Sequence, residues 1–238
     1  DLSPVSIKGI ELTISDMAFS KGWVTPKVAP QKTGKRIAII GSGPCGLSAA
    51  QQLARKGHAV AVYERHSSPG GLMTYGIPNF KLDKSKIKTR LTQLEAEGVK
   101  FKTNVEIGTD ITLGHLSTTH DAVLIAVGAN KPRPLAIEDP FPMDKNEMIN
   151  HKSDIISADL FLKEQIELIL KERKLLSVSA KNKKVIVIGG GDTGADCVGT
   201  SVRQGAESID QLEIMPKPLD PKMVNTSTSH EEGCSRHW

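Results

Sequence analysis

Two glycine-rich segments carry the residues of this sequence that are best suited to bind a ligand. Both match the pattern GxGxxG, and their glycines are Gly41, Gly43 and Gly46 in the first segment and Gly189, Gly191 and Gly194 in the second. In such a turn the first glycine permits a tight bend, and the second lets the backbone approach a pyrophosphate. The third lets the next helix pack closely, and the free N–H groups of that helix attract phosphate oxygens. Each segment therefore predicts a dinucleotide site.

An acidic residue accompanies each glycine segment at the expected distance along the chain. Glu64 follows the apolar run 59–63, and Glu213 lies at the end of the apolar run 209–214. At the end of the second strand of such a unit, a carboxylate accepts hydrogen bonds from ribose hydroxyl groups. A lone GxGxxG is a weak signal, but this context strengthens both matches.

Glu213 also bears on the choice of nicotinamide dinucleotide. A carboxylate at this position binds a free ribose 2′-hydroxyl and repels a 2′-phosphate. The segment 211–216 contains no arginine, which favours NADH. Arg203 and Lys217 are close enough in sequence to accept a phosphate, so NADPH stays open as the alternative.

The elements around these motifs indicate an α/β protein. Apolar runs at 37–40 and 185–188 predict buried strands directly before the two glycine segments. Further elements are predicted as helices at 6–21, 84–97 and 160–174 and as strands at 99–103 and 121–128. In the first of these helices, the helical spacing of Ile10, Ile14 and Met17 predicts a packing face.

The fold class that follows is α/β with two Rossmann-like dinucleotide-binding units. The second unit is expected to be truncated, because periodicity ends soon after Pro218. The expected organisation is an N-terminal helical segment and linker, a first dinucleotide-binding domain, a crossover with a helix, a partial second dinucleotide-binding domain and an irregular tail. Their ranges are 1–34, 35–135, 136–183, 184–220 and 221–238.

Composition narrows the class of protein. The 238 residues are 38% hydrophobic and 24% charged, with a formal net charge of +4 and only 4% aromatic residues. Without a basic run, nucleic-acid binding is not indicated. No apolar stretch is long enough to span a membrane and no signal peptide is recognisable, so a cytoplasmic protein without membrane association is expected.

Three cysteines, Cys45, Cys197 and Cys234, lie far apart in the sequence. They predict neither a disulfide framework nor a metal site. Cys45 and Cys197 both follow a glycine segment, and we expect them to be small residues packed between helix and sheet.

Several longer strings identify a resemblance. They comprise 18–23 (AFSKGW), 63–65 (YER) with 70–72 (GGL), 75–78 (YGIP) with Lys81 and Leu82, 126–128 (AVG), and 189–194 (GGGDTG) with Asp196, Cys197 and Thr200. Together they resemble the glutamate synthase small subunit (beta chain) and the homologous FAD-NAD(P)H region of fused glutamate synthases, over roughly residues 4 to 220.

This resemblance implies an FAD domain interrupted by an inserted NAD(P)H domain. By motif, the FAD pyrophosphate would contact Gly41, Gly43, Pro44 and Gly46, and Glu64 would bind the adenosine ribose. Gly71, Leu72 and Lys81 would lie near the flavin, and Gly128 would end the strand that crosses to the second domain. The nicotinamide dinucleotide would contact Gly189, Gly191, Asp192, Thr193 and Gly194.

The resemblance also implies an oxidoreductase. Electrons would pass from NADH or NADPH through FAD to an iron-sulfur carrier and then to the glutamate synthase large subunit, for glutamate synthesis from glutamine and 2-oxoglutarate. No side chain is nominated as a catalytic acid or base, because the cofactors carry the chemistry. The sequence lacks four clustered cysteines, so an iron-sulfur cluster is expected only outside this chain segment.

Two other functions remain open at this point. The same electron-input module could serve another iron-sulfur reductase, because nothing in the sequence identifies the acceptor. Alternatively, the truncated second unit could leave a non-catalytic remnant that binds FAD or a partner.

Overall fold

The structure, a computed structural model, describes residues 5–129, 149–150 and 155–216. It divides into two compact units, Asp1–Ser179 and Ala180–Trp238, and each is treated by itself. The expected tail at 221–238 lies outside the described residues, as does most of the segment 136–154. The finer domain boundaries stay predictions.

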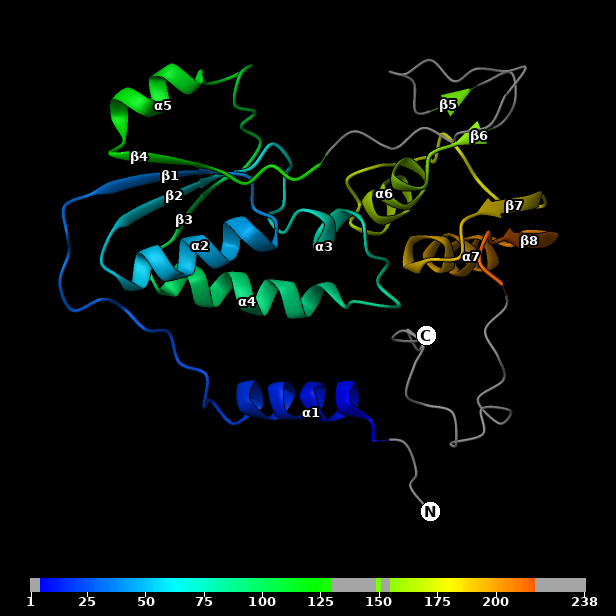
Figure 1. Cartoon of the computed structure of the whole chain (residues 1–238), viewed down its shortest axis with the longest axis horizontal. Helices are drawn as coiled ribbons and strands as arrows, with labels where there is room; N and C mark the ends of the chain where they lie inside the picture. Colours follow the sequence, from blue (N-terminus) through cyan, green and yellow to red (C-terminus); the bar gives the residue numbers. More distant parts are fainter. Residues whose placement is uncertain (1–4, 130–148, 151–154, 217–238) are drawn as a thin grey trace. The chain divides into compact units, whose positions relative to one another are not determined.

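A four-stranded parallel sheet forms the centre of the first unit (Figure 1). Its strands are β1 (Arg36–Ile40), β2 (Ala59–Tyr63), β3 (Lys100–Lys102) and β4 (Ala122–Ile125), in the order β3-β2-β1-β4. In register, Ile39 of β1 lies opposite Val62 of β2 and Leu124 of β4. Strands β1 and β2 each have a neighbour on both sides, and Ala38 and Ile39 of β1 are fully buried.

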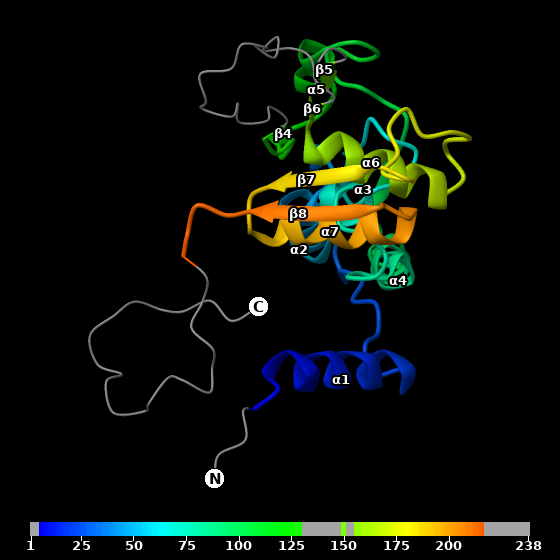
Figure 2. The same ribbon diagram turned by 90° about the vertical axis from the view of Figure 1, so that its right-hand side faces the viewer.

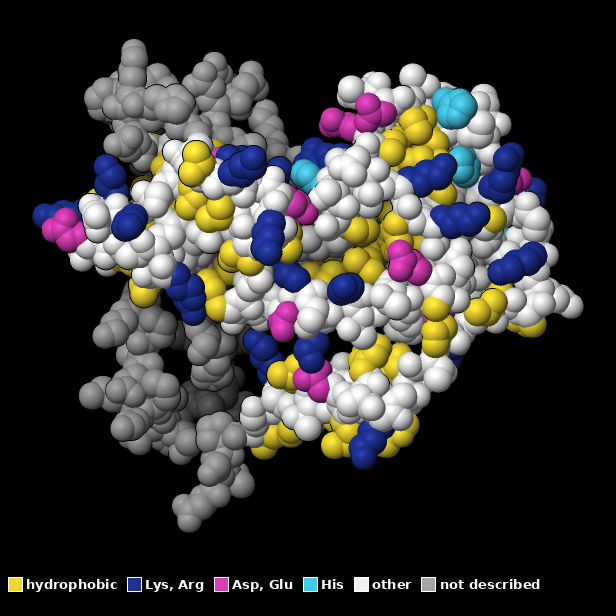
Figure 3. Space-filling view, turned by 180° about the vertical axis from the view of Figure 1, so that it is seen from behind, with side chains coloured by type: hydrophobic (Ala, Val, Ile, Leu, Met, Phe, Trp, Pro, Cys, Tyr) yellow, Lys and Arg dark blue, Asp and Glu magenta, His cyan; other side chains and the backbone are white. Residues whose placement is uncertain are grey.

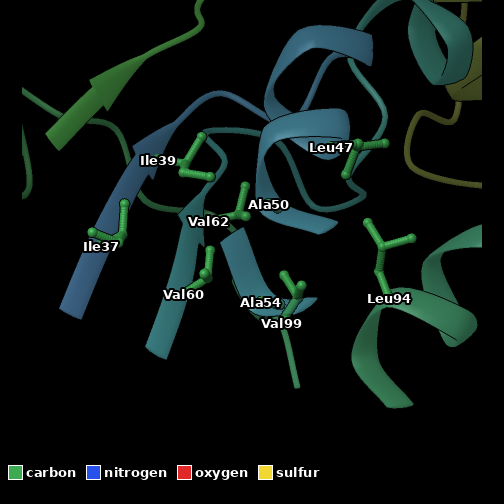
Figure 4. Packing of buried hydrophobic residues seen from close by; sticks show 9 residues of the cluster. All are labelled: Ile37, Ile39, Leu47, Ala50, Ala54, Val60, Val62, Leu94 and Val99. Carbon is green, nitrogen blue, oxygen red and sulfur yellow. The ribbon is translucent and has the colours of Figure 1, made fainter. Parts of the chain in front are cut away.

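Helices cover both faces of this sheet. In Figure 1, α2 (Pro44–Arg55) and α4 (Lys84–Ala96) lie on one side and α5 (Leu113–Thr119) on the other. Strand side chains alternate between the faces, so Ile37 and Ile39 pack toward α2, while Ala38 and Ile40 pack with Leu116 of α5. Figure 4 shows the larger core cluster, made of Ile37, Ile39, Leu47, Ala50, Ala54, Val60, Val62, Leu94 and Val99.

The other elements of the first unit are shorter or peripheral. They are α1 (Ile7–Ser20), the one-turn helix α3 (Leu72–Tyr75), the antiparallel strands β5 (Ile149–Asn150) and β6 (Ile155–Ile156), and α6 (Ala158–Ile169).

The second unit repeats the start of the first. Strand β7 (Lys184–Ile188) leads through the second glycine segment into α7 (Asp192–Gln204), and β8 (Ser208–Leu212) returns parallel to β7. Figure 2 shows the two strands side by side, with α7 next to them. Gly205 ends α7 in the left-handed conformation (φ 84°), which glycine adopts without steric cost.

Three expectations about elements were wrong in detail. The apolar positions of α1 do not form a buried face: Ile10, Ile14 and Met17 stay exposed. The helix expected at 160–174 starts at Ala158 and ends at Ile169, because the chain turns at Lys171, whose φ is positive. Strand β4 ends at Ile125 rather than at Gly128.

Within the described part of the chain, no helix is both long enough and apolar enough to cross a membrane. Figure 3 shows lysine and arginine side chains interspersed with acidic and hydrophobic ones over the described residues in that view.

Candidate dinucleotide-binding sites

The first glycine turn joins β1 to α2 with the geometry that a close-approaching ligand needs. Gly41 has φ 98°, and a Cβ on Gly46 would lie 2.1 Å from the Gly41 carbonyl oxygen, so neither position tolerates a side chain. In contrast, a Cβ on Gly43 would meet nothing within 4 Å, and Gly43 caps α2. Pro44 is the first residue of the helix, where its missing N–H is not needed. The backbone at Gly43 is thus open to a ligand.

The second glycine turn has the same geometry in the second unit. Gly189 has φ 117°, and a Cβ on Gly194 would lie 2.1 Å from the Gly189 carbonyl oxygen. Gly191 caps α7, and a Cβ there would meet nothing within 4 Å. Asp192 and Thr193 are exposed and begin the helix. Each open helix N-terminus suits a phosphate, since its first N–H groups lack partners within the helix.

Glu64 is fixed against the first glycine turn. It follows β2 directly and is 5% exposed. Ser42 donates both its hydroxyl and its N–H (3.3 Å) to Glu64 Oε2, and the N–H of His66 donates to Oε1 (2.9 Å). The carboxylate is therefore held at the carboxyl end of β2 beside the turn.

Ser42 also connects this carboxylate to a second turn. Its Oγ accepts a hydrogen bond from the N–H of Gly70 (2.9 Å). The next residue, Gly71, has φ 56° and caps α3, and a Cβ on it would lie 2.8 Å from the Cα of Gly43. The structure therefore brings Gly41, Gly43, Gly46, Glu64 and Gly71 into one cluster.

The remaining predicted residues of the first unit lie at its margins. Leu72 begins α3 and is 69% exposed, and Lys81 is exposed in the turn before α4. Beyond β4, the backbone of Ala126 lies against the first turn, since a Cβ on Gly41 would be 2.4 Å from the Ala126 carbonyl oxygen. Gly128 follows with φ 69°.

Glu213 lies against the second glycine turn, directly after β8. A Cβ on Gly190 would lie 1.9 Å from this carboxylate, so the glycine lets the Glu213 side chain pack directly against the turn. A hydrogen bond from the Met215 N–H (3.0 Å) is the main cause that lowers the pKa of Glu213, although the side chain is exposed. Arg203 donates to the Gly199 carbonyl oxygen within α7. Lys217 lies outside the described residues.

An open pocket of about 560 Å³ is lined in part by the residues that follow Glu64 in the sequence. Tyr75 donates its hydroxyl to Glu172 Oε2 (3.1 Å), and its ring lies tilted against that of His66, with ring centroids 4.6 Å apart. Burial raises the pKa of Tyr75 and lowers that of His66. The residues that line the pocket are Arg65, His66, Ser67, Asn104, Glu167, Glu172 and Arg173.

Sequence reasoning did not single out Ser42, Tyr75 or Glu172. Ser42 occupies a variable position of the fingerprint, so only its neighbours signalled a site. Glu172 is 97 residues from Tyr75, and no local pattern announces their contact. The expectation for Cys45 was wrong: it is exposed at the start of α2, whereas Cys197 is buried as expected, and burial raises its thiol pKa to about 11.

Known proteins share this sequence and fold. The chain is 44% identical to the glutamate synthase [NADPH] small chain of Mycobacterium tuberculosis, over 98% of this chain and 49% of that protein. It is 46% identical to the glutamate synthase [NADH] of Schizosaccharomyces pombe, over 91% of this chain and 10% of that protein. These relatives confirm the resemblance, although the chain spans about half the length of the small chain.

Among solved structures, Mycobacterium tuberculosis FprA in complex with NADPH is 28% identical, with a TM-score of 0.54, over 69% of this chain and 36% of that chain. The family model described as pyridine nucleotide-disulphide oxidoreductase matches residues 35–232. Since this match covers most of the chain and includes both glycine turns, the chain belongs to the pyridine nucleotide-disulphide oxidoreductase family.

Proposed function

We propose that this chain is the electron-input part of a glutamate synthase, which binds FAD in its first unit and a nicotinamide dinucleotide in its second. One observation carries the proposal: the same glycine geometry occurs twice, each time with an open second glycine at the start of a helix. A single dinucleotide would need only one such turn. The family match and the names of the relatives support the same function.

The residues of the first unit fit FAD. The open backbone at Gly43 admits a pyrophosphate, and Gly41 and Gly46 let α2 start close to the strand. Glu64 is held where it can accept hydrogen bonds from the adenosine ribose, and Pro44 keeps the helix start in place. Gly71, Leu72 and Lys81 would line the flavin side, and Gly128 would mark the crossing to the second domain.

The residues of the second unit fit a nicotinamide dinucleotide in the same way. Its phosphates would lie at Gly191, Asp192 and Thr193, and Gly189 and Gly194 would shape the turn. Glu213 favours NADH, because its carboxylate would meet the ribose 2′-hydroxyl and repel a 2′-phosphate. The names of the relatives include both donors.

When both cofactors are bound, the nicotinamide supplies a hydride and the flavin converts this two-electron transfer into single electrons. The chain itself binds and orients the two dinucleotides. We further propose that the electrons leave through an iron-sulfur carrier to the glutamate synthase large subunit or domain, with the cluster held outside this chain segment.

An anaerobic absorbance titration of the FAD-reconstituted chain tests this function. NADH should bleach the visible flavin band, and NADPH should do so only at higher concentration. Glu213→Ala should reduce the ratio of the NADPH concentration to the NADH concentration that bleaches the flavin by about tenfold, since it removes the repulsion of a 2′-phosphate. Glu207→Ala, an exposed acid just before β8, is the matched control. Bound flavin that neither donor bleaches would contradict the electron-input function.

A further inference from the structure

The one-turn helix α3 is a weak element that contacts the first glycine turn. Four residues cannot form a stable helix by their own hydrogen bonds, so the surrounding residues must hold α3 in place. Its start lies against the Cα of Gly43 through Gly71 and against Ser42 through the Gly70 N–H. Any movement of α3 therefore changes the open face of the glycine turn.

Lys84, the first residue of α4, holds the other end of α3. Its ammonium group donates hydrogen bonds to the carbonyl oxygen of Met73 (2.7 Å) and to that of Ile77. Met73 lies within α3, and Ile77 lies in the turn that follows it. A lysine that caps the last carbonyl groups of a helix satisfies acceptors that the helix itself cannot.

The charges near Lys84 leave these carbonyl groups as its main partners. Asp83, the N-cap residue just before α4, favours the charged ammonium, but burial has the larger effect and lowers the pKa of Lys84 to about 8. Across from it, the only titratable side chain between Gly70 and Pro78 is Tyr75, whose hydroxyl bonds to Ser67 and Glu172 instead.

We propose that Lys84 is a positioning residue for the dinucleotide site of the first unit, because its ammonium holds α3 against the glycine turn. The inference rests on the proposed function and adds a specific residue to it. Lys84 itself lies outside the glycine cluster, so it acts through α3 and not through contact with the phosphates.

The pH dependence of FAD binding tests the proposal in the full chain. The protonated amine makes charge-assisted bonds, which are stronger than those of the neutral amine. FAD affinity of the wild type should therefore fall severalfold as the pH rises from 7 to 9, through the pKa of Lys84. Lys84→Met should bind FAD about tenfold more weakly and without this pH step. Lys84→Arg stays charged and should lack the step as well.

Lys88→Met is the matched control, because Lys88 is an exposed lysine on the same helix. It should keep both the affinity and the pH step of the wild type. Hydrogen exchange of the backbone amides at 72–77, measured without FAD at one pH, gives an independent readout. Exchange there should be faster in Lys84→Met than in the wild type and unchanged in Lys88→Met.

The outcomes separate the two proposals. If the wild type binds FAD but Lys84→Met keeps its affinity, its pH step and its amide protection, the role of Lys84 is disproved and the proposed function stands. If the wild type binds no FAD, the proposed function and this inference fail together, whatever the amide exchange shows. Faster exchange combined with weaker, pH-independent FAD binding in Lys84→Met supports the inference.

Discussion

The side chain of Ser42 links two turns beside the first glycine motif. Its fully buried hydroxyl donates to Glu64 and accepts from the Gly70 N–H, so one group joins the carboxylate of Glu64 to the turn before α3. A GxGxxG fingerprint specifies only the glycines. The side chain at a variable position thus joins two parts of the candidate site, although the fingerprint does not specify it.

A double-mutant cycle measures this connection. Ser42→Ala and Glu64→Gln should each weaken FAD binding by about tenfold, or about 1.4 kcal/mol, because each removes or weakens a hydrogen bond that orients the site. The double variant should lose much less FAD affinity than the sum of the two single losses, since both substitutions weaken or remove the same contact between Ser42 and Glu64. Fluorescence titration with FAD gives the four affinities.

Ser117→Ala is the control for this cycle, since its hydroxyl is exposed and bonds only within α5. It should change neither the FAD affinity nor the effect of Glu64→Gln. If the losses of FAD affinity in Ser42→Ala and Glu64→Gln are fully additive, the two side chains act independently. This result would contradict the coupling inferred from their hydrogen bonds.

At the scale of elements, Glu97 joins α2 and α4 beneath the sheet. Its fully buried carboxylate accepts hydrogen bonds from Arg55 (2.6 and 2.8 Å) and Gln51 (2.9 Å) of α2 and from Gln93 (3.0 Å) of α4. The N–H of Lys27 adds a further bond (3.2 Å) from the N-terminal connection. Burial disfavours ionisation, but these donors outweigh it and lower the pKa of Glu97 to about 2.

We expect Glu97→Gln to lower the free energy of unfolding at pH 7 by about 3 kcal/mol, because it leaves the partly buried Arg55 without its counter-charge. The pKa of Glu97 is lower in the folded state than its ordinary value of 4.5, so its contribution is complete above that value. As the pH falls from 4.5 toward 2, wild-type stability should approach that of the variant.

Urea unfolding followed by circular dichroism at several pH values measures this difference. Glu95→Ala, an exposed acid on α4, should match the wild type within about 0.5 kcal/mol. The free energies of unfolding of the wild type and Glu97→Gln are expected to converge at low pH. If their difference instead stays constant from pH 7 to pH 3, the ionised carboxylate is not what stabilises the contact.

The elements also show which parts of the fold the sequence could predict. Strands β1, β2 and β7 were predicted within a residue, because each is a short run of apolar residues and a glycine turn directly follows both β1 and β7. Helices α3 and α5 were not predicted: α3 depends on Lys84 from another element, and α5 contributes a single buried residue, Leu116. Patterns along the chain cannot reveal an element that only its neighbours stabilise.

At the scale of the whole molecule, the sequence likewise predicts only part of the candidate site. The glycine motifs and their acidic partners Glu64 and Glu213 were found from spacing, because backbone geometry alone imposes that spacing. The contacts of Glu172 with Tyr75 and Ser67 join segments about 100 residues apart and required the fold. The sequence near each glycine turn thus predicts the residues expected to contact a ligand, whereas residues that support them come from distant parts of the chain.

The two compact units also predict that the two cofactors bind independently. Gly43→Ala and Gly191→Ala each add a methyl group that meets no protein atom within 4 Å, so both variants should fold normally. Each methyl group would instead occupy the space of a bound pyrophosphate. Gly43→Ala should therefore weaken FAD binding at least tenfold and leave NADH binding unchanged, and Gly191→Ala should do the reverse.

Calorimetric titration of each variant with FAD and with NADH measures the four affinities, and flavin bleaching by NADH should be impaired in both variants. The third glycines serve as the contrast. In Gly46→Ala and Gly194→Ala the methyl group would meet a carbonyl oxygen at 2.1 Å, so these variants should lose folding stability as well as binding. If Gly191→Ala weakened FAD binding as much as Gly43→Ala does, the two glycine turns would not bind separate dinucleotides. The proposed assignment of FAD to the first unit and of the nicotinamide dinucleotide to the second would then be wrong.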